Sequence, residues 1–218
     1  MKVVVFDLVE TLLDLRPLDS HFKRAFGNVD ARKIWFGSIL QIAFTQTITG
    51  EYKNFAKNAE AALTLTAAQM EKQLKPADRA AITKQLETLP LHPDVIPALT
   101  MLRDNDIRCA VLTNSTRRSA LQHLKAASAS KLFEAVLSVD QIKRYKPAPE
   151  AYLHAANKLG VETSDILLVA AHGWDVAGAM AAGCNAAFVA RPGKTLNPLQ
   201  KKPKYVVDDL LQLERKLT

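Results

Sequence analysis

Short apolar runs alternate with amphipathic segments over most of the chain. Polar or turn residues bound each run, and the runs lie at residues 2–7 (KVVVFD), 108–113 (RCAVLT), 134–138 (EAVLS), 166–170 (ILLVA) and 185–189 (NAAFV). Helical periodicity occupies residues 94–104, 117–126, 148–158, 175–182 and 207–216. Continuous apolar runs are typical of strands buried on both faces, so the alternation predicts an α/β fold with a parallel sheet between two layers of helices.

Residues 15–89 interrupt this alternation. They contain long helical patterns, such as IWFGSILQIAF and NFAKNAEAALTL, and no convincing strand. We therefore expect a core domain of residues 1–14 and 90–218, with a helical cap domain of residues 15–89 inserted after the first strand. A cap at that point is expected to cover the carboxyl ends of the strands, where open parallel sheets bind ligands. Within it, the residues expected in the core are Trp35, Phe36, Ile39 and Leu40.

The composition is that of a globular protein. Of the 218 residues, 48% are apolar and 23% charged. The first apolar run is broken by Asp7, so it predicts neither a signal peptide nor a membrane span, and we expect a cytoplasmic location. Cys109 and Cys184 lie within apolar runs without zinc-like spacing, which predicts two buried free thiols.

A formal net charge of +7 raises the question of a nucleic-acid partner. The basic residues are scattered apart from Lys201, Lys202 and Lys204, and aromatic residues are few. We therefore expect neither a nucleic-acid nor a membrane partner. A basic surface instead favours the approach of a small anionic substrate.

Chemically reactive side chains gather at the ends of the predicted strands. They are Asp7 and Thr11, Thr113 and Asn114, Lys146, and His172 with Asp175. Because the ends of parallel strands converge, these groups are expected to share one pocket.

This constellation resembles the haloacid dehalogenase superfamily, and within it the L-2-haloacid dehalogenases. FDLVETLLD resembles the strand-end nucleophile motif, and VLTNST the second motif, a hydroxyl residue at a strand end. KPAPEAY resembles the third motif with Lys146 and Tyr152, and LLVAAHGWDVAGAMAAG the fourth with Trp174 and Asp175. The resemblance covers nearly the whole chain and implies a Rossmann-like core with a helical cap.

Two departures separate the chain from the phosphatases of that superfamily. Val9 stands where they carry a second Asp that protonates the leaving oxygen, and Ala171 where they hold magnesium with an acidic residue. A halide leaving group needs neither protonation nor a metal ion. The resemblance therefore implies a metal-independent enzyme without a cofactor that displaces halide from 2-halo carboxylic acids.

The resemblance also implies catalytic roles. Asp7 would attack the carbon that bears the halogen and form an ester, which water then hydrolyses. Lys146 would keep Asp7 ionised, Asp175 would hold Lys146, and Thr11 would donate a hydrogen bond to the nucleophile or the substrate. His172, at a position where the family often has Asn, would position or activate the water; the alternative is a structural histidine.

Four further residues are expected to bind substrate. Thr113 would donate to the nucleophile or the substrate carboxylate, and Asn114 would solvate the departing halide. Tyr152 would orient the network, although packing is an equal alternative, and Val9 would line the site.

Two further departures leave alternatives open. Gly37 stands where the family places a catalytic Arg in the cap, with Arg32 or Lys33 as substitutes, and Glu10 replaces the Gly of the nucleophile motif. The rival hypotheses are a phosphatase with altered metal use and a catalytically silent binding protein. A homodimer is a further possibility that the resemblance implies.

Overall fold

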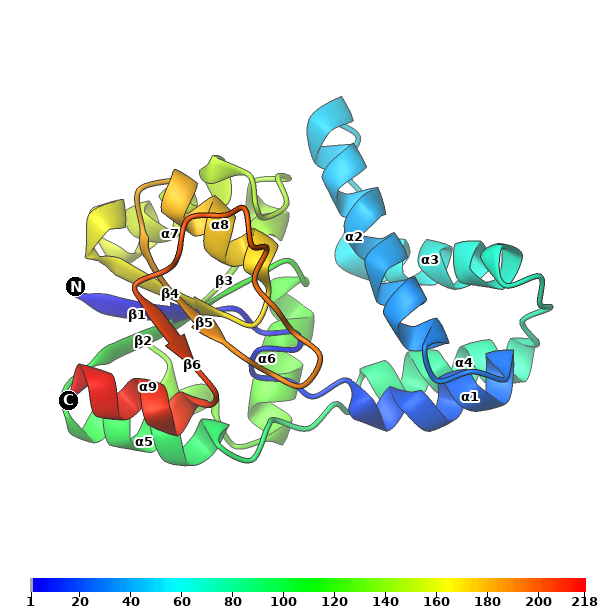
Figure 1. The fold of residues 1–218 in the computed structure, drawn as a ribbon, viewed down its shortest axis with the longest axis horizontal. Coiled ribbons are helices and arrows are strands. Elements are labelled where there is room, and N and C mark those ends of the chain that lie inside the picture. The colour runs from blue at the N-terminus through cyan, green and yellow to red at the C-terminus, as the bar shows by residue number, and fades with distance from the viewer. Residues whose placement is uncertain (1) are drawn as a thin grey trace. The chain divides into compact units, whose positions relative to one another are not determined.

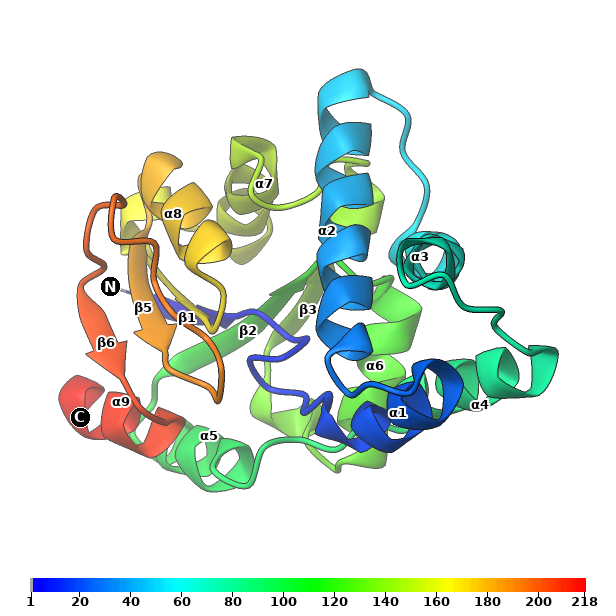
Figure 2. The same cartoon turned by 45° about the vertical axis from the view of Figure 1, so that its right-hand side comes forward.

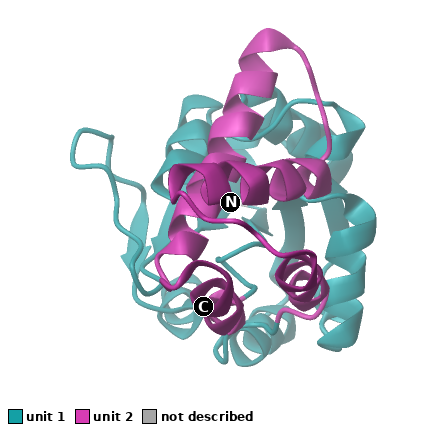
Figure 3. Cartoon of the chain, turned by 90° about the vertical axis from the view of Figure 1, so that its right-hand side faces the viewer, with its two compact units in different colours: residues 1–13, 90–218 teal, residues 14–89 magenta. Residues whose placement is uncertain are grey.

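The structure is a computed structural model that describes residues 2–218. Contacts divide the chain into two compact units, the first made of Met1–Leu13 with Pro90–Thr218 and the second of Asp14–Leu89 (Figure 3). Within residues 2–218, no helix is both long enough and apolar enough to cross a bilayer.

Unit 1 contains a six-stranded parallel sheet with the order β3-β2-β1-β4-β5-β6 (Figure 1). Its strands are β1 Val3–Phe6, β2 Arg108–Thr113, β3 Ala135–Ser138, β4 Ile166–Ala170, β5 Asn185–Val189 and β6 Tyr205–Val207. The predicted parallel sheet and its first five strands are confirmed. β1 is central, with Val5 opposite Ala110 of β2 on one side and Leu168 of β4 on the other.

Helices cover both faces of this sheet, as predicted. They are α5 Val95–Asp104, α6 Arg117–Ala126, α7 Pro149–Leu159, α8 Gly173–Ala181 and α9 Leu210–Leu217. α7 and α8 lie on one face, and α5, α6 and α9 on the other (Figures 1 and 2). From β1 the chain adds β2 and β3 on one side of the sheet and then crosses over to add β4 and β5 on the other side. Because such crossovers are right-handed, the helices of the two halves cover opposite faces.

The core beneath α7 and α8 follows the alternation of side chains along the strands. Val3 and Val5 of β1 point to this face and pack in one buried cluster with Tyr152, Leu168 and Val176. α7 begins with Pro149 at its first turn and ends at Gly160, whose φ of 67° is left-handed. These helix ends set the length of α7 and hence the position of Tyr152.

The predicted start of the last helix at residue 207 was wrong. Tyr205–Val207 form β6, which pairs with β5, and the helix begins at Leu210. The Asp209 side chain accepts a hydrogen bond from the Gln212 backbone amide and so caps the helix there. The three-residue run YVV was too short to be recognised as a strand.

Unit 2 consists of helices, and none of residues 14–89 lies in a strand. Its elements are η1 Arg16–Leu18, α1 Asp19–Phe26, α2 Ala31–Thr49, α3 Phe55–Gln69 and α4 Pro76–Leu86. Trp35 of α2 donates from Nε1 to the Ala59 carbonyl of α3 at 2.9 Å and packs on Phe22 of α1. Trp35, Phe36 and Ile39 are buried as predicted, whereas Leu40 is only half-buried.

Candidate active site

Asp7 follows the last residue of β1 and lies at the centre of a buried polar network. Its backbone amide continues the sheet by donating to the Val169 carbonyl at 2.9 Å. Oδ1 accepts from Nζ of Lys146 at 2.8 Å, and Oδ2 accepts from Oγ1 of Thr11 at 2.7 Å. Burial alone would raise the pKa of Asp7, but Lys146 and His172 outweigh it and hold that pKa well below its usual value of 3.8. Asp7 is therefore an ionised carboxylate with little solvent around it.

Lys146 is fully buried, and its ammonium group has a full set of acceptors. Nζ donates to Asp7, to Oδ2 of Asp175 at 2.5 Å and to the Leu112 carbonyl at 3.0 Å. Three acceptors match the three protons of an ammonium group. Burial would lower the pKa of Lys146, but Asp175 and Asp7 raise it overall, so the group remains a cation.

The backbone of Lys146 is held by Asn114. Asn114 accepts from the Lys146 amide at 2.9 Å through Oδ1 and donates to the Lys146 carbonyl at 3.4 Å through Nδ2. The following Lys146–Pro147 peptide bond is cis. Asn114 thus contacts the backbone of Lys146, and its expected contact with halide remains a prediction.

Gly178 of α8 lets this segment approach the helix closely. A Cβ atom at residue 178 would lie 2.4 Å from Cβ of Pro147 and 2.7 Å from the Tyr152 hydroxyl oxygen. Only a residue without a side chain fits there. The need for glycine at residue 178 could not be predicted from the sequence, because it depends on a contact between distant segments.

Asp175, in the first turn of α8, joins Lys146 to Tyr152. The Tyr152 hydroxyl donates to Oδ1 of Asp175 at 2.6 Å and to the Asp175 carbonyl at 3.0 Å. Burial and the neighbouring carboxylate raise the pKa of Tyr152 well above 10.0, so it remains a hydrogen-bond donor. Burial raises the pKa of Asp175 as well, against the effect of Lys146.

Thr11 links Asp7 to the end of β4. Its hydroxyl donates to Asp7 and accepts from the Ala171 amide at 2.9 Å. Its carbonyl accepts from Nε and Nη2 of Arg191 at 3.1 and 3.0 Å, and Nη1 of Arg191 pairs with Asp94 at 2.8 Å. Arg191 was missed from the sequence, since nothing nearby in the chain indicates that a residue after β5 reaches the loop after β1.

His172 lies between two carboxylates. Its Nδ1 is 3.4 Å from Oδ2 of Asp7, and its Nε2 is 3.0 Å from Oε2 of Glu10. Glu10 also forms an ion pair with Lys194. Burial lowers the pKa of His172, but hydrogen bonds to Asp7 and Glu10 raise it overall above 6.5. Burial raises the pKa of Glu10, but His172 and Lys194 lower it overall below 4.5.

Little in the sequence indicates this second cluster of His172, Glu10 and Lys194. Glu10 stood out only as a replacement for the motif's glycine, and its φ of 65° shows that the chain keeps the left-handed turn that glycine favours. Lys194 carried no signal, because it lies in a loop far along the chain from Glu10.

The remaining predicted residues lie around the same edge of the sheet. Thr113 is the last residue of β2, and its hydroxyl accepts from the Ser115 amide at 3.0 Å. Val9 is half-buried in the turn between Asp7 and Thr11. Their contacts with substrate remain predictions. Cys109 and Cys184 are buried free thiols, as predicted, and burial raises the pKa of each to about 12.

The side chains around Asp7 do not fit a magnesium site. Within residues 2–218, no three His, Cys, Asp or Glu side chains are placed to share a metal ion. The Lys146 ammonium lies between the carboxylates of Asp7 and Asp175 and would repel a divalent cation there. Val9 and Ala171 offer apolar side chains at the positions where the phosphatases hold acids.

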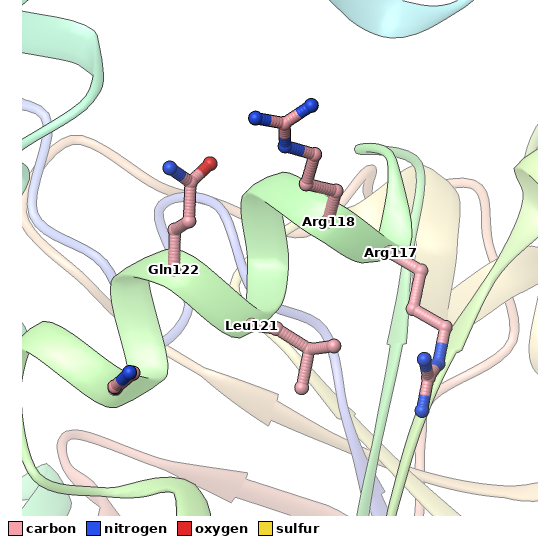
Figure 4. A pocket seen from close by; sticks show the side chains of 5 residues that line it. Arg117, Arg118, Leu121 and Gln122 are labelled. Carbon is pink, nitrogen blue, oxygen red and sulfur yellow. The ribbon is translucent and has the colours of Figure 1, made fainter.

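A surface pocket lies along α6. The residues that line it are Arg117, Arg118, Leu121, Gln122 and Lys125, and Figure 4 labels the first four of them. None of the predicted site residues is among them.

The candidate cations of unit 2 are paired within that unit. Arg32 lies 2.5 Å from Asp19, and Lys33 lies 2.8 Å from Asp30. Gly37 is an exposed residue of α2, and a Cβ added to it would have no neighbour within 4 Å.

Comparison with known proteins gives consistent matches. The family model for haloacid dehalogenase-like hydrolases matches residues 1–183. Haloacetate dehalogenase H-2 of Moraxella sp. (strain B) is 27% identical over 95% of this chain and 93% of its own length. (S)-2-haloacid dehalogenase 2 of Pseudomonas sp. (strain CBS-3) is 27% identical over 98% of this chain and 94% of its own. The crystal structure of the L-2-haloacid dehalogenase RSc1362 superposes with a TM-score of 0.94 at 27% identity, covering 100% of this chain and 98% of that chain.

Proposed function

The chain belongs to the haloacid dehalogenase-like hydrolases, and from this premise we propose that it hydrolyses the carbon-halogen bond of small (S)-2-halo carboxylic acids. The observation that carries the proposal is the environment of Asp7. Its carboxylate is ionised, buried, and held by Lys146 and Thr11. Such a group is suited to act as a nucleophile toward carbon.

In the first half-reaction, a carboxylate oxygen of Asp7 attacks the second carbon of the substrate. The carbon-halogen bond breaks, and the halide departs with the bonding electron pair. Attack from the side opposite the halogen inverts the configuration and leaves the substrate esterified to Asp7. The role of Lys146 is to keep Asp7 ionised until the attack, since a buried carboxylate without a cation would take up a proton.

In the second half-reaction, water attacks the carbonyl carbon of the ester. The bond between that carbon and the Asp7 oxygen that is joined to the substrate breaks, which releases a 2-hydroxy acid and leaves a carboxylate on Asp7 that contains the water oxygen. Asp175 and Tyr152 keep Lys146 in place through both steps. Thr11 holds Oδ2 of Asp7 and so restrains the orientation of the carboxylate.

A phosphatase is the main rival, and the same residues argue against it. Phosphoryl transfer needs a cation to neutralise the equatorial oxygens and an acid to protonate the leaving oxygen. Val9 provides no acid, and Ala171 provides no carboxylate for a metal ion. Halide displacement requires neither group.

A direct comparison of leaving groups tests the proposal. Free halide is measured from L-2-chloropropionate, and phosphate from p-nitrophenyl phosphate, each with magnesium and with a chelator. We expect halide release that a chelator leaves unchanged, and no phosphate release. Turnover of the phosphate ester that depends on magnesium would support the phosphatase, and a lack of both activities would support a binding protein.

Two finer proposals accompany this one. Cys109 and Cys184, as buried free thiols, support a cytoplasmic location, which fractionation of cells that make the protein would test. The family resemblance supports a homodimer, which analytical ultracentrifugation would test.

A further inference from the structure

His172 and Glu10 form a buried pair beside Asp7. The steps assigned above to Lys146, Asp175 and Tyr152 give this pair no role. The Asp7 carboxylate has Lys146 at one oxygen and Thr11 with His172 at the other. His172 and Glu10 stand in place of the Asn and Gly of the family pattern. The two substitutions are in direct contact through Nε2 of His172 and Oε2 of Glu10, 3.0 Å apart.

We propose that His172, oriented by Glu10, is the general base that takes a proton from the water that hydrolyses the Asp7 ester. This inference rests on the proposed function, because it concerns the second half-reaction. Glu10 is a positioning residue, since it acts through His172.

The geometry fixes which ring nitrogen can act. With Glu10 ionised, Nε2 of His172 carries the proton that it donates to Glu10. In a neutral ring, Nδ1 is then the acceptor, and Nδ1 is the atom 3.4 Å from Asp7. The Trp174 ring stacks on the imidazole with centroids 5.1 Å apart and an interplanar angle of 25°, which restrains the plane of the ring.

The charges around His172 change between the two half-reactions. Asp7 and Glu10 face the ring as anions, Lys194 faces Glu10 as a cation, and Lys146 lies on the other oxygen of Asp7. With both carboxylates ionised, His172 is favoured as an imidazolium. Formation of the ester removes the charge of Asp7, while burial and Lys194 still favour the neutral ring. The imidazolium then loses its proton to solvent and becomes a base when a base is needed.

Both protons of the attacking water have a destination in this step. Water gives a proton to Nδ1 of His172 as its oxygen bonds to Cγ of Asp7. The bond between Cγ and the ester oxygen then breaks, and that oxygen takes the proton from Nδ1 to leave as the hydroxyl of the 2-hydroxy acid. The Asp7 carboxylic acid that results ionises, and its proton passes to solvent.

The first test needs no turnover. The imidazole resonances of His172 are titrated by NMR in the wild type and in Asp7→Asn, which carries a neutral side chain as the ester does. We expect Asp7→Asn to lower the pKa of His172 by about one unit or more. Glu10→Gln is expected to lower it too, whereas Glu162→Gln, at an exposed residue, should leave it unchanged. A His172 pKa that is the same in the wild type and in both site variants would overturn the inference.

The second test separates the half-reactions. With L-2-chloropropionate in a rapid-quench experiment, His172→Gln should still release about one halide per site in its first turnover, because Lys146 and Thr11 still hold Asp7. Steady-state turnover should then fall by about 100-fold or more, because general base catalysis contributes about that much. Intact-mass analysis should find the ester accumulating on the variant. His154→Gln, at a partly exposed histidine on α7 that pairs with Gln141, serves as the matched control and should behave as the wild type.

The outcomes distinguish this inference from the proposed function. If His172→Gln released halide and kept the wild-type steady-state turnover, the role of His172 would be contradicted, but the proposed function would not. A wild type that releases no halide from any 2-halo acid would contradict the proposed function and this role with it.

Discussion

The ammonium nitrogen of Lys146 lies 2.8 Å from Oδ1 of Asp7, although the two residues are separated by 139 positions in the chain. Asp7 follows the central strand, and Lys146 comes from the segment between β3 and α7. A third charged group, Asp175, lies 2.5 Å from the same ammonium. The cation between two buried carboxylates keeps Asp7 ionised, and it makes the site dependent on Lys146 for stability as well as for chemistry.

Replacement of the nucleophile should abolish turnover. Asp7→Asn removes the anionic oxygen that forms the ester, so halide release is expected to fall by at least about 1000-fold. Halide release from L-2-chloropropionate measures this loss. Asp165→Asn is the matched control, at a carboxylate that pairs with Lys2 on the surface, and should retain activity. Near-normal turnover in a folded Asp7→Asn protein would contradict the assignment.

Removal of the buried ammonium should destabilise the fold. Lys146→Met leaves Asp7 and Asp175 as uncompensated buried carboxylates, which is expected to cost about 3–5 kcal/mol of the free energy of unfolding. Urea denaturation followed by circular dichroism measures the change. Lys158→Met, at an exposed residue of α7, should change stability little. Equal stability of the two variants would show that the buried ion pairs do not support the fold.

Two helical glycines should respond in opposite directions to the same substitution. Gly178→Ala places a methyl group against Pro147 and the Tyr152 hydroxyl, and overpacking is expected to cost about 1–3 kcal/mol. Gly37→Ala meets open space in α2 and is expected to gain about 0.5–1 kcal/mol from helix propensity. Thermal unfolding of both variants checks the signs. If Gly178→Ala were as stable as the wild type, α8 would not pack as closely on Pro147 as we describe.

A cation in α2 should improve the reaction. Gly37→Arg restores the residue type that the family resemblance implies at this position, and α2 has room for it within unit 2. We expect kcat/KM for L-2-chloropropionate to rise. Gly37→Gln, of similar length without the charge, is the control and should have no such effect. A folded Gly37→Arg protein with lower halide release would show that residue 37 does not correspond to the family's arginine.

The first half-reaction should persist in acid. The folded-state pKa of Asp7 lies below its usual value of 3.8, so the nucleophile remains ionised at about pH 5. The same shift contributes stability that is present above pH 3.8 and is lost as the pH falls through the folded pKa. Single-turnover halide release is therefore expected to be as large at about pH 5 as at neutral pH. A burst that shrinks with an apparent pKa above 3.8 would mean that Asp7 is not held as an anion.

The parallel sheet and five of its strands could be predicted from the sequence. Short continuous apolar runs such as VVVF and ILLVA are typical of strands that are buried on both faces. The placement of Asp7, Lys146 and Asp175 at one edge of the sheet could also be predicted, because the carboxyl ends of parallel strands lie at the same edge. The strand β6 was missed because a run of three residues at a sheet edge, of which only Val207 is buried, carries almost no pattern.

Contacts between loops distant in the chain could not be predicted. Arg191 reaches the Thr11 carbonyl, and Lys194 reaches Glu10, from a loop that has no periodicity and no motif. Gly178 is one of several glycines in the sequence, and only the three-dimensional approach of Pro147 shows why it must be one. The partners of Asn114 could not be predicted either, because an amide at a strand end has many possible acceptors and donors.

Isotope labelling shows whether an ester forms on Asp7 during turnover. In a single turnover with enzyme in excess over L-2-chloropropionate in H₂¹⁸O, the water oxygen attacks Cγ of Asp7 and not the substrate. We expect ¹⁸O to enter the carboxylate of Asp7, as mass spectrometry of the peptide that contains it would show, while the hydroxyl group of the 2-hydroxy acid remains unlabelled. Label in the hydroxyl group of the product, with Asp7 unlabelled, would contradict the formation of an ester.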